Sequence, residues 1–324
     1  MNRFRRLSVS LAILSAALGV PALCAAQVFP ARPVTLVVPY PAGGSADILA
    51  RTVGQKLSEK LGQPVVIENK GGAGTAIGAR HVAEAAPDGY TLLLGTVSSH
   101  AINPAMSKVG YDPVRDFVAV APLGSIPFVL AAYPGTPYQT LPELLAAAKR
   151  QPGTISYASA GPGTSNHLAG EMLASAAGIK LMHVPYRGSA PALADVLAGH
   201  VPLMFDLQAT SAAYVRQGKL KALAVTGAQR SALLPNVPTV AESGLPGYEV
   251  SAWFAVFAPA KVPLPVQKRL SDSLTEVLHA PDMLQKLREL GVEPDARSPA
   301  EFNTYVRTEA EKYERVVKAA DLAR

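Results

Sequence analysis

Cysteine is almost absent from this chain of 324 residues, which contains a single one, Cys24. Cys24 lies in an N-terminal segment that we expect to be removed, and the remaining sequence has no thiol. A chain without thiols forms no disulfide, binds no metal through cysteine and uses no cysteine nucleophile. Its stability must therefore come from an ordinary hydrophobic core, which about 298 residues are enough to bury.

Charged and aromatic residues are also scarce, at 17% and 6% of the sequence. The formal charge of +6 falls to +3 without Arg3, Arg5 and Arg6 of the N-terminal segment. No basic cluster with interleaved aromatic residues occurs, so nucleic acid is a poor partner. A weak positive charge is compatible with an anionic small ligand, although net charge alone does not identify one.

Signatures of metal and cofactor binding are missing as well. The six histidines are scattered, and no HExxH motif or paired metal-ligand spacing occurs. The glycine-rich stretch "GGAGTAIG" (71–78) has Ile77 where a dinucleotide-binding loop needs its third glycine, and no acidic residue ends the strand that follows. We therefore expect neither a metal nor a cofactor.

What the sequence does contain begins with an export signal. "MNRFRR" is a basic segment, an apolar run follows, and small residues Cys24 and Ala26 stand at the −3 and −1 positions of a cut after Ala26. The alternative is an N-terminal membrane anchor, because the run is nearly long enough to span a bilayer. The cleavage motif favours a signal peptide over residues 1–26 and a periplasmic location.

Apolar strand-like runs alternate with helix-like segments along the rest of the chain. We expect strands at 34–39, 65–69, 91–96, 117–123, 127–134, 155–161, 182–186, 201–206, 220–226 and 250–259. We expect helices at 45–61, from the Gly-rich turn to 86, 140–150, 165–177, 189–198, 210–217, 263–279, 281–290 and 299–320. The early strands are continuously apolar, which is typical of parallel sheets covered on both faces.

This order predicts an α/β protein of two halves. The runs at 117–134 and near 220–258 are long, apolar and bounded by proline, so they are candidates for crossing between the halves. A chain that crosses twice builds its first domain from both ends and leaves a cleft and a hinge.

Two glycine loops that precede helices are candidates for holding an anion. In "YPAGGSAD" (40–47), Gly43 and Gly44 allow close approach to the backbone, and Ser45 or Asp47 can cap the helix. Backbone N–H groups at such a helix start attract anions. The alternative is a plain strand-to-helix turn.

The second loop, "SAGPGTSNHLAGE" (159–171), offers N-capping by Thr164 or Ser165 and places His167 in the first turn of a helix. It suggests an alternative function, an exported serine hydrolase with Ser165 as nucleophile and His167 as base. The loop lacks the Gly-x-Ser-x-Gly pattern of a nucleophile elbow, and His167 is otherwise explained as a hydrogen-bonding residue at the helix start.

Two charged residues further along the chain give opposite indications about the ligand. Arg187, followed by Gly188, is a candidate cation for a second carboxylate. Asp206 ends a strand, where it could accept a hydrogen bond from an amine or hydroxyl, or cap the next helix.

Several stretches form a specific combination through their order and spacing: "YPAGGSAD", "VVIENKGGAG", "PDGYTLLLGT", "YDPVRDFVAVAPLG", "GPGTSNHLAGE", "HVPYRGSAPALADVLAGHV", "MFD", "GKLKALAVT" and "PNVPTVAESGLPGYEVSAWFAVFAPAKVP". The combination resembles the Bug family, the extracytoplasmic solute receptors of tripartite tricarboxylate transporters. The resemblance covers essentially the whole chain after residue 26. One departure is "GAGTA", with Thr75 and Ala76 where relatives often have Gly and Asn.

The resemblance implies a two-domain Venus-flytrap periplasmic binding fold, with domain 1 formed by 27–126 plus 251–324 and domain 2 by 127–250. It implies that a ligand carboxylate lies in the cleft between them. The implied ligand-binding residues are Tyr40, Ala42, Gly43, Gly44, Asp47, Thr96, Ser98, Gly163, Thr164, Ser165, His167, Arg187, Gly188 and Asp206.

The leading hypothesis is a monomeric receptor that binds a small carboxylate without chemistry and delivers it to a membrane permease, or acts as an orphan sensor. Amino acids, di- and tricarboxylates and aromatic acids all fit a site that holds one carboxylate. The competing hypotheses are the hydrolase and an anion-binding scaffold that does not close around its ligand.

Overall fold

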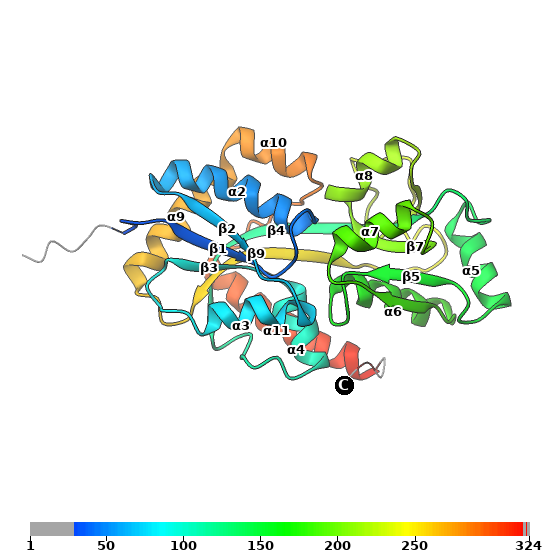
Figure 1. Ribbon diagram of the computed structural model, residues 1–324, viewed down its shortest axis with the longest axis horizontal. Coiled ribbons are helices and arrows are strands. Elements are labelled where there is room, and N and C mark those ends of the chain that lie inside the picture. The colour runs from blue at the N-terminus through cyan, green and yellow to red at the C-terminus, as the bar shows by residue number, and fades with distance from the viewer. Residues whose placement is uncertain (1–28, 320–321, 323–324) are drawn as a thin grey trace, which may run out of the picture.

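The apolar runs of the sequence form a mixed β-sheet flanked by helices in two lobes, as a computed structural model of the chain shows (Figure 1). The model describes residues 29–319 and 322; the expected signal peptide lies outside these residues. Within the described part, nine strands run in the order β2-β1-β3-β9-β4-β7-β5-β6, and β8 pairs with β4. The N-terminal and C-terminal segments share the first lobe, and the middle of the chain forms the second (Figure 1).

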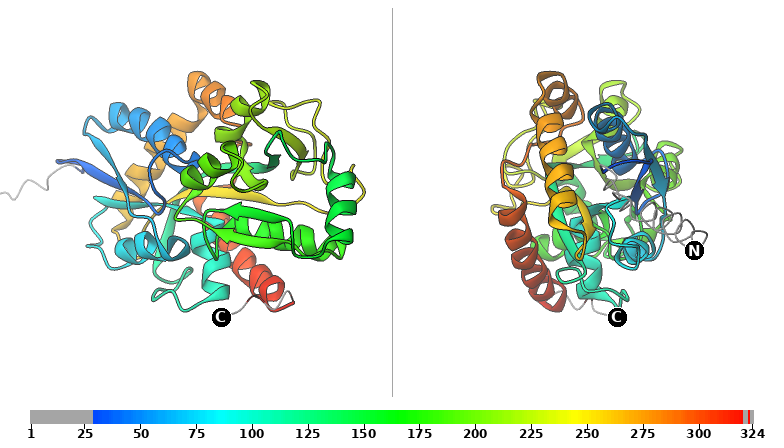
Figure 2. Two further views of the ribbon diagram at one scale, coloured as in Figure 1. Left: turned by 45° about the vertical axis from the view of Figure 1, so that its right-hand side comes forward. Right: turned by 90° about the vertical axis from the view of Figure 1, so that its left-hand side faces the viewer.

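The first lobe contains both ends of the described chain. Its strands are β1 (Val34–Val38), β2 (Val65–Asn69), β3 (Thr91–Thr96), the first part of β4 (Phe117–Ala132) and β9 (Ser251–Pro259). Its helices are α2 (Ser45–Leu61), η1 (Ala73–Thr75), α3 (Ala76–Ala83), η2 (Ser98–Ile102), α4 (Asn103–Met106), α9 (Leu264–His279), α10 (Pro281–Glu289) and α11 (Pro299–Ala319). α9 and α11 pack against β4 on one side of this lobe (Figure 2).

The second lobe is formed by the intervening residues. Its strands are the end of β4 with β5 (Ser156–Ser159), β6 (Met182–Pro185), β7 (Leu203–Leu207) and β8 (Lys221–Val225). Its helices are α5 (Leu141–Arg150), α6 (Ser165–Ala177), α7 (Ser189–Leu197) and α8 (Gln208–Arg216).

Helix α2 shows why the sequence predicts these elements well. Leu49, Val53 and Leu57 recur every four residues and are all buried, as expected for one face of an amphipathic helix. The helix ends at Gly62, whose left-handed backbone (φ 68°) places its N–H on the carbonyl oxygen of Ser58. The expected bounds, 45–61, are those of the structure.

The two expected strands at 117–123 and 127–134 are a single strand, β4, so that prediction was wrong. β9 pairs with β4 on both sides of Pro122 and Gly124, and the register shifts between these two residues as in a β-bulge. The partners of β4 then change: β9 pairs with it up to Pro127, and β7 begins at Phe128. β4 and β9 therefore connect the two lobes.

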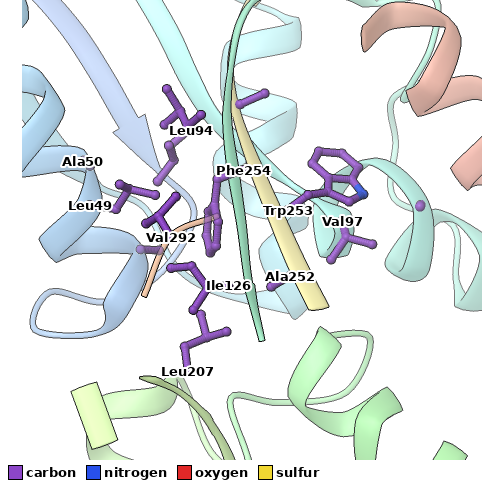
Figure 3. Packing of buried hydrophobic residues seen from close by; sticks show 14 of the residues in the cluster. Leu49, Ala50, Leu94, Val97, Ile126, Leu207, Ala252, Trp253, Phe254 and Val292 are labelled. Carbon is purple, nitrogen blue, oxygen red and sulfur yellow. The ribbon is translucent and has the colours of Figure 1, made fainter. Parts of the chain in front are cut away.

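The expectation of a parallel sheet is confirmed only within each lobe. β1 runs parallel to β2 and β3, and β5 runs parallel to β6 and β7, but β4 and β9 are antiparallel to their neighbours. One buried cluster spans the connection between the lobes and includes Ile126, Leu207 and Phe254 (Figure 3). Within the described residues, no helix combines the length and apolar character needed to cross a membrane.

Candidate functional site

A small cavity lies between the lobes, and uncharged residues from both of them line it. These residues are Tyr40, Pro41, Gly44, Ser45, Ala46, Thr96, Ser165, Asn166, Ser189, Leu207, Ala252 and Phe254. The cavity volume is about 20 Å³, which is room for one or two water molecules. The lobes are therefore closed on each other, and a larger molecule could enter only if they moved apart.

Three helix N-termini meet at this cavity. Gly44 to Ala46 begin α2, Ser165 and Asn166 begin α6, and Ser189 begins α7. None of the three helices has a side-chain cap of its own, so the expectation that Ser45, Asp47, Thr164 or Ser165 caps its helix was wrong. The partial positive charges of three helix starts favour an anion there without any cationic side chain.

Glycine and proline allow the loops to approach one another so closely. Gly188, before α7, has φ +126°, and a Cβ added to it would lie 2.7 Å from the ring of Pro41 in the other lobe. Gly43 has φ +86° in the turn that leads into α2. Side chains at either position would strain the backbone, and one at position 188 would also separate the lobes.

Asp47 holds the first loop in place. Its Oδ2 accepts hydrogen bonds from the backbone N–H of Gly43 and from Nε of Arg51, both at 3.0 Å, and its Oδ1 accepts one from Asn69. Burial alone would raise the pKa of Asp47, but these hydrogen bonds outweigh it and lower the pKa below its ordinary value. The Asp47 carboxylate therefore stabilises the loop through hydrogen bonds to Gly43, Arg51 and Asn69.

Hydroxyl groups join the lobes across the cavity. Ser45 Oγ lies 3.0 Å from Oγ1 of Thr210 on α8, and Ser98 Oγ accepts a hydrogen bond from the backbone N–H of Ser165 at 3.0 Å. Tyr40 and Thr96 pair through their hydroxyls in the first lobe at 3.3 Å. Burial raises the pKa of Tyr40, so its hydroxyl remains a hydrogen-bond donor.

Asp206 lies behind the hydroxyl groups of Thr210 and Ser45 and is fully buried. Its Oδ2 accepts a hydrogen bond from Thr210 at 2.5 Å, whereas its Oδ1 has no hydrogen-bond partner in the described part of the chain. Burial raises the pKa of Asp206 to about 7, although the hydrogen bonds from Thr210 and the Leu207 backbone oppose the rise.

The structure brings four of the expected binding residues to the cavity wall: Tyr40, Gly44, Thr96 and Ser165. None of the other expected residues lines it. Ala42, Gly43 and Asp47 form or support the first loop, and Ser98, Gly163 and Gly188 lie against the opposite lobe. Thr164 bonds to Gly161 within the second loop, His167 packs on His183, and Asp206 is behind Thr210. Arg187 is exposed on the surface, apart from the lining residues.

Several lining residues were not among those expected from the sequence. Ser189 follows Gly188 at a helix start, as Ser45 follows Gly44, so the repeated Gly-Ser pattern is a signal that could have identified it. Ala252 and Phe254 come from β9, where buried apolar residues carry no sign that a cavity lies beside them.

The residues of the hydrolase alternative have other contacts. The hydroxyl of Ser165 lies 3.4 Å from that of Ser98. The ring of His167 lies against that of His183, with centroids 4.1 Å apart, and its Nε2 is 3.7 Å from Glu171. His167 is therefore explained by packing at the start of α6, whereas Ser165 lines the cavity and contacts the opposite lobe.

Two lobes joined by two long antiparallel strands, with helix N-termini facing a small cavity lined by uncharged residues, define the architecture of a two-lobed binding protein. The model of the tripartite tricarboxylate transporter receptor family matches residues 49–322. The chain belongs to this family of periplasmic solute-binding receptors. A Pseudomonas sp. (strain P51) protein from the tcbD-tcbE intergenic region is 40% identical over 290 residues, which is 89% of this chain and 86% of that protein.

Solved structures show the same fold. The periplasmic binding protein BugD is 36% identical (TM-score 0.87), and the superposition covers 91% of this chain and 99% of BugD. The Rhodopseudomonas palustris protein Rpa4515, solved with adipate, is 37% identical (TM-score 0.88; 91% and 99% covered). MatC of the same organism, solved with malate, is 35% identical (TM-score 0.85; 89% and 100% covered). The family and the two-domain binding fold expected from the sequence are confirmed.

Proposed function

We propose that this chain is a monomeric periplasmic receptor that captures a small carboxylate between its lobes, leaves it chemically unchanged and delivers it to the permease of a tripartite tricarboxylate-type transporter. The observation that carries the proposal is the convergence of three helix N-termini on a cavity whose lining residues carry no charge. Such a site attracts anions through backbone dipoles and hydroxyl donors. None of its lining residues is a cation, which would attract anions of every kind.

The family supports a carboxylate as the anion. Rpa4515 and MatC, both at least 35% identical to this chain, were solved with the dicarboxylates adipate and malate. Adipate has a longer carbon chain than malate, so related sites accept acids of different length. For this chain we propose the class, a small mono- or dicarboxylate, with contacts from Tyr40, Gly44, Thr96 and Ser165 and from the lining residues Ser45, Asn166 and Ser189.

Capture requires a hinge. We propose domain 1 as 27–126 plus 251–324 and domain 2 as 127–250, supported by the change of partners of β4 between Pro127 and Phe128 and by the start of β9 at Ser251. A carboxylate held by helix starts of both domains favours the closed form, because only that form makes both sets of contacts.

A thermal-shift screen tests the proposal. The panel contains adipate, malate, succinate, citrate, aspartate, glutamate and benzoate, each paired with its neutral amide as a matched control. A carboxylate at a hundred times its Kd stabilises the protein by about 2.7 kcal/mol and raises Tm by several degrees, whereas its amide leaves Tm unchanged. The absence of binding by every carboxylate, or conversion of a bound one during incubation, would overturn the proposal.

Delivery and location need separate measurements. The mature N-terminus of exported protein, read by mass spectrometry, is expected to be Gln27. Cells with a deletion of this receptor are expected to lose uptake of the ligand found in the screen, and to regain it with the wild-type chain. Uptake that is independent of the receptor would contradict the transport role and leave carboxylate binding intact.

A further inference from the structure

Asp206 is a buried carboxyl group with one oxygen left without a partner. It lies on β7 with its side chain fully buried, and only Oδ2 accepts a side-chain hydrogen bond, from Thr210. Within the described residues, Oδ1 has no partner. An ionised carboxylate in this position keeps a negative charge away from water and leaves one acceptor unsatisfied, which is costly.

A short chain of hydroxyls connects Asp206 to the wall of the cavity. Thr210 Oγ1 lies 2.5 Å from Asp206 Oδ2 and 3.0 Å from Ser45 Oγ. Ser45 belongs to the opposite lobe and lines the cavity. Asp206 is therefore two hydrogen bonds behind the surface that we propose to hold the ligand, and closure of the lobes completes this connection.

In the described part of the chain, no hydrogen bond or ion pair joins Asp206 to a charged group. The elements packed against β7 are β4, β5, α6, α7 and α8. β4 has no charged residue, and the titratable residues of the others are Tyr157 (β5), His167 and Glu171 (α6), Asp195 (α7), and Tyr214 and Arg216 (α8). None of them is among the causes that shift the pKa of Asp206, which are burial and the hydrogen bonds from Thr210 and Leu207. On the opposite helix α2, Asp47 and Arg51 are bonded to each other.

We propose that the protein takes up one proton at Asp206 when it captures a carboxylate in the cleft. A ligand carboxylate in this closed and cation-free cavity repels an ionised Asp206, because little water is present to screen the two charges. The proton comes from the solvent and binds a carboxylate oxygen of Asp206, and no other bond changes. The neutral acid removes the buried negative charge, which is the larger cost of the ionised form. This inference rests on the proposed function.

The inference also concerns the class of ligand. A ligand with an ammonium group would stabilise ionised Asp206 by pairing with it, and its capture would need no proton. Proton uptake therefore distinguishes a plain or hydroxylated acid, whose capture protonates Asp206, from an amino acid, whose capture leaves Asp206 ionised.

Isothermal titration calorimetry counts the protons. The probe is adipate, or malate if malate binds more tightly, titrated into the full mature chain at each pH in two buffers that both have a pKa near that pH and differ in ionisation enthalpy. At pH 8.5 we expect uptake of about 0.5 to 1 proton per ligand, and at pH 6.0 about 0.1, because Asp206 is then already protonated. Affinity is expected to fall by up to about tenfold per pH unit above pH 7.

Two variants locate the proton. Asp206→Asn keeps a neutral hydrogen-bonding group and is expected to bind with uptake near zero and less than about a twofold change in Kd from pH 6.0 to 8.5. Asp195→Asn, which alters a half-exposed aspartate bonded to Tyr186, is the matched control and is expected to behave as the wild type. If Asp206→Asn does not fold, Thr210→Val replaces it: loss of the Thr210 hydrogen bond raises the pKa of Asp206 further, so proton uptake at pH 8.5 is expected to fall, and unchanged uptake overturns the inference.

The outcomes separate this inference from the proposed function. Wild-type binding without proton uptake at pH 8.5 overturns the inference and leaves the receptor function standing. Uptake that persists in Asp206→Asn also overturns it, because the proton then binds elsewhere. Failure of every carboxylate in the panel to bind overturns the proposed function and the inference together.

Discussion

Ser98, in the first lobe, accepts a hydrogen bond from the backbone N–H of Ser165, the first residue of α6 in the second lobe, at 3.0 Å. A side chain of one lobe thus caps a helix of the other, in the place of the missing cap from α6 itself. The contact can form only while the lobes are closed, and an entering anion would compete for the same N–H group.

The first prediction concerns this contact. Ser98→Ala removes the cap and is expected to lower the free energy of unfolding by about 1 kcal/mol. It should also enlarge the radius of gyration of the ligand-free protein in small-angle scattering, because one link between the lobes is lost. Ser107→Ala removes a hydroxyl bonded within the first lobe, to Asn103, and serves as the control. An unchanged radius of gyration in Ser98→Ala would argue against a role in closure.

Gly44 can be replaced by a small side chain but not by a branched one. A Cβ at Gly44 would meet only Cβ of Ser189, at an ordinary 3.8 Å, and φ at Gly44 is not positive. Gly44→Ala is therefore expected to change carboxylate affinity little. The two methyl groups of Gly44→Val would extend toward the cavity and are expected to weaken binding about tenfold or more, a loss of at least about 1.4 kcal/mol. Calorimetry that shows equal Kd values for both variants would exclude this loop from the site.

Asp47 should stabilise the fold in a pH-dependent way. Its pKa is lowered in the folded protein, so its contribution is present above the ordinary pKa of aspartate and is lost as the pH falls through the lowered value. Asp47→Asn is expected to cost about 1–3 kcal/mol at pH 7, measured by urea unfolding, and much less near pH 2. Asp272→Asn, which breaks an exposed pair with Lys268, is the control and should cost less than about 1 kcal/mol.

His100 should destabilise the protein in acid. It is buried, its ring stacks on Phe257 with centroids 4.0 Å apart, and burial lowers its pKa to about 3. The unfolded chain binds a proton near pH 6.5 that the folded chain does not, so the free energy of unfolding falls by about 1.4 kcal/mol per pH unit between pH 6.5 and 3.

His100→Phe tests the origin of this slope. Phenylalanine fits the surrounding aromatic residues Phe117, Trp253 and Phe257, and it removes the titrating group. We expect the variant to lose that part of the pH dependence. Parallel curves of unfolding free energy against pH for the variant and the wild type would show that His100 does not cause the slope.

Local patterns predicted most of the elements. The bounds expected for α2, β2, β3 and α6 agree with the structure, because apolar periodicity, glycine at helix ends and turn residues act over a few neighbouring positions. η2 was not predicted, since the segment from Ser98 has no helical periodicity and is fixed by burial between β3 and α11. The continuity of β4 was missed for a similar reason: its bulge is stabilised by β9, more than a hundred residues away in sequence.

The sequence by itself determined the class of protein: an α/β chain with glycine loops before helices, in an order that resembles one receptor family, and without an HExxH motif, a complete dinucleotide-binding loop or a nucleophile elbow. The tertiary structure decided which of these residues meet. It placed three helix starts around one cavity and left Arg187 exposed. It bonded Asp47 to the loop that contains Gly43 and buried Asp206 behind Thr210. Local propensity depends on neighbours along the chain, whereas a site between two lobes depends on contacts that only the closed fold brings together.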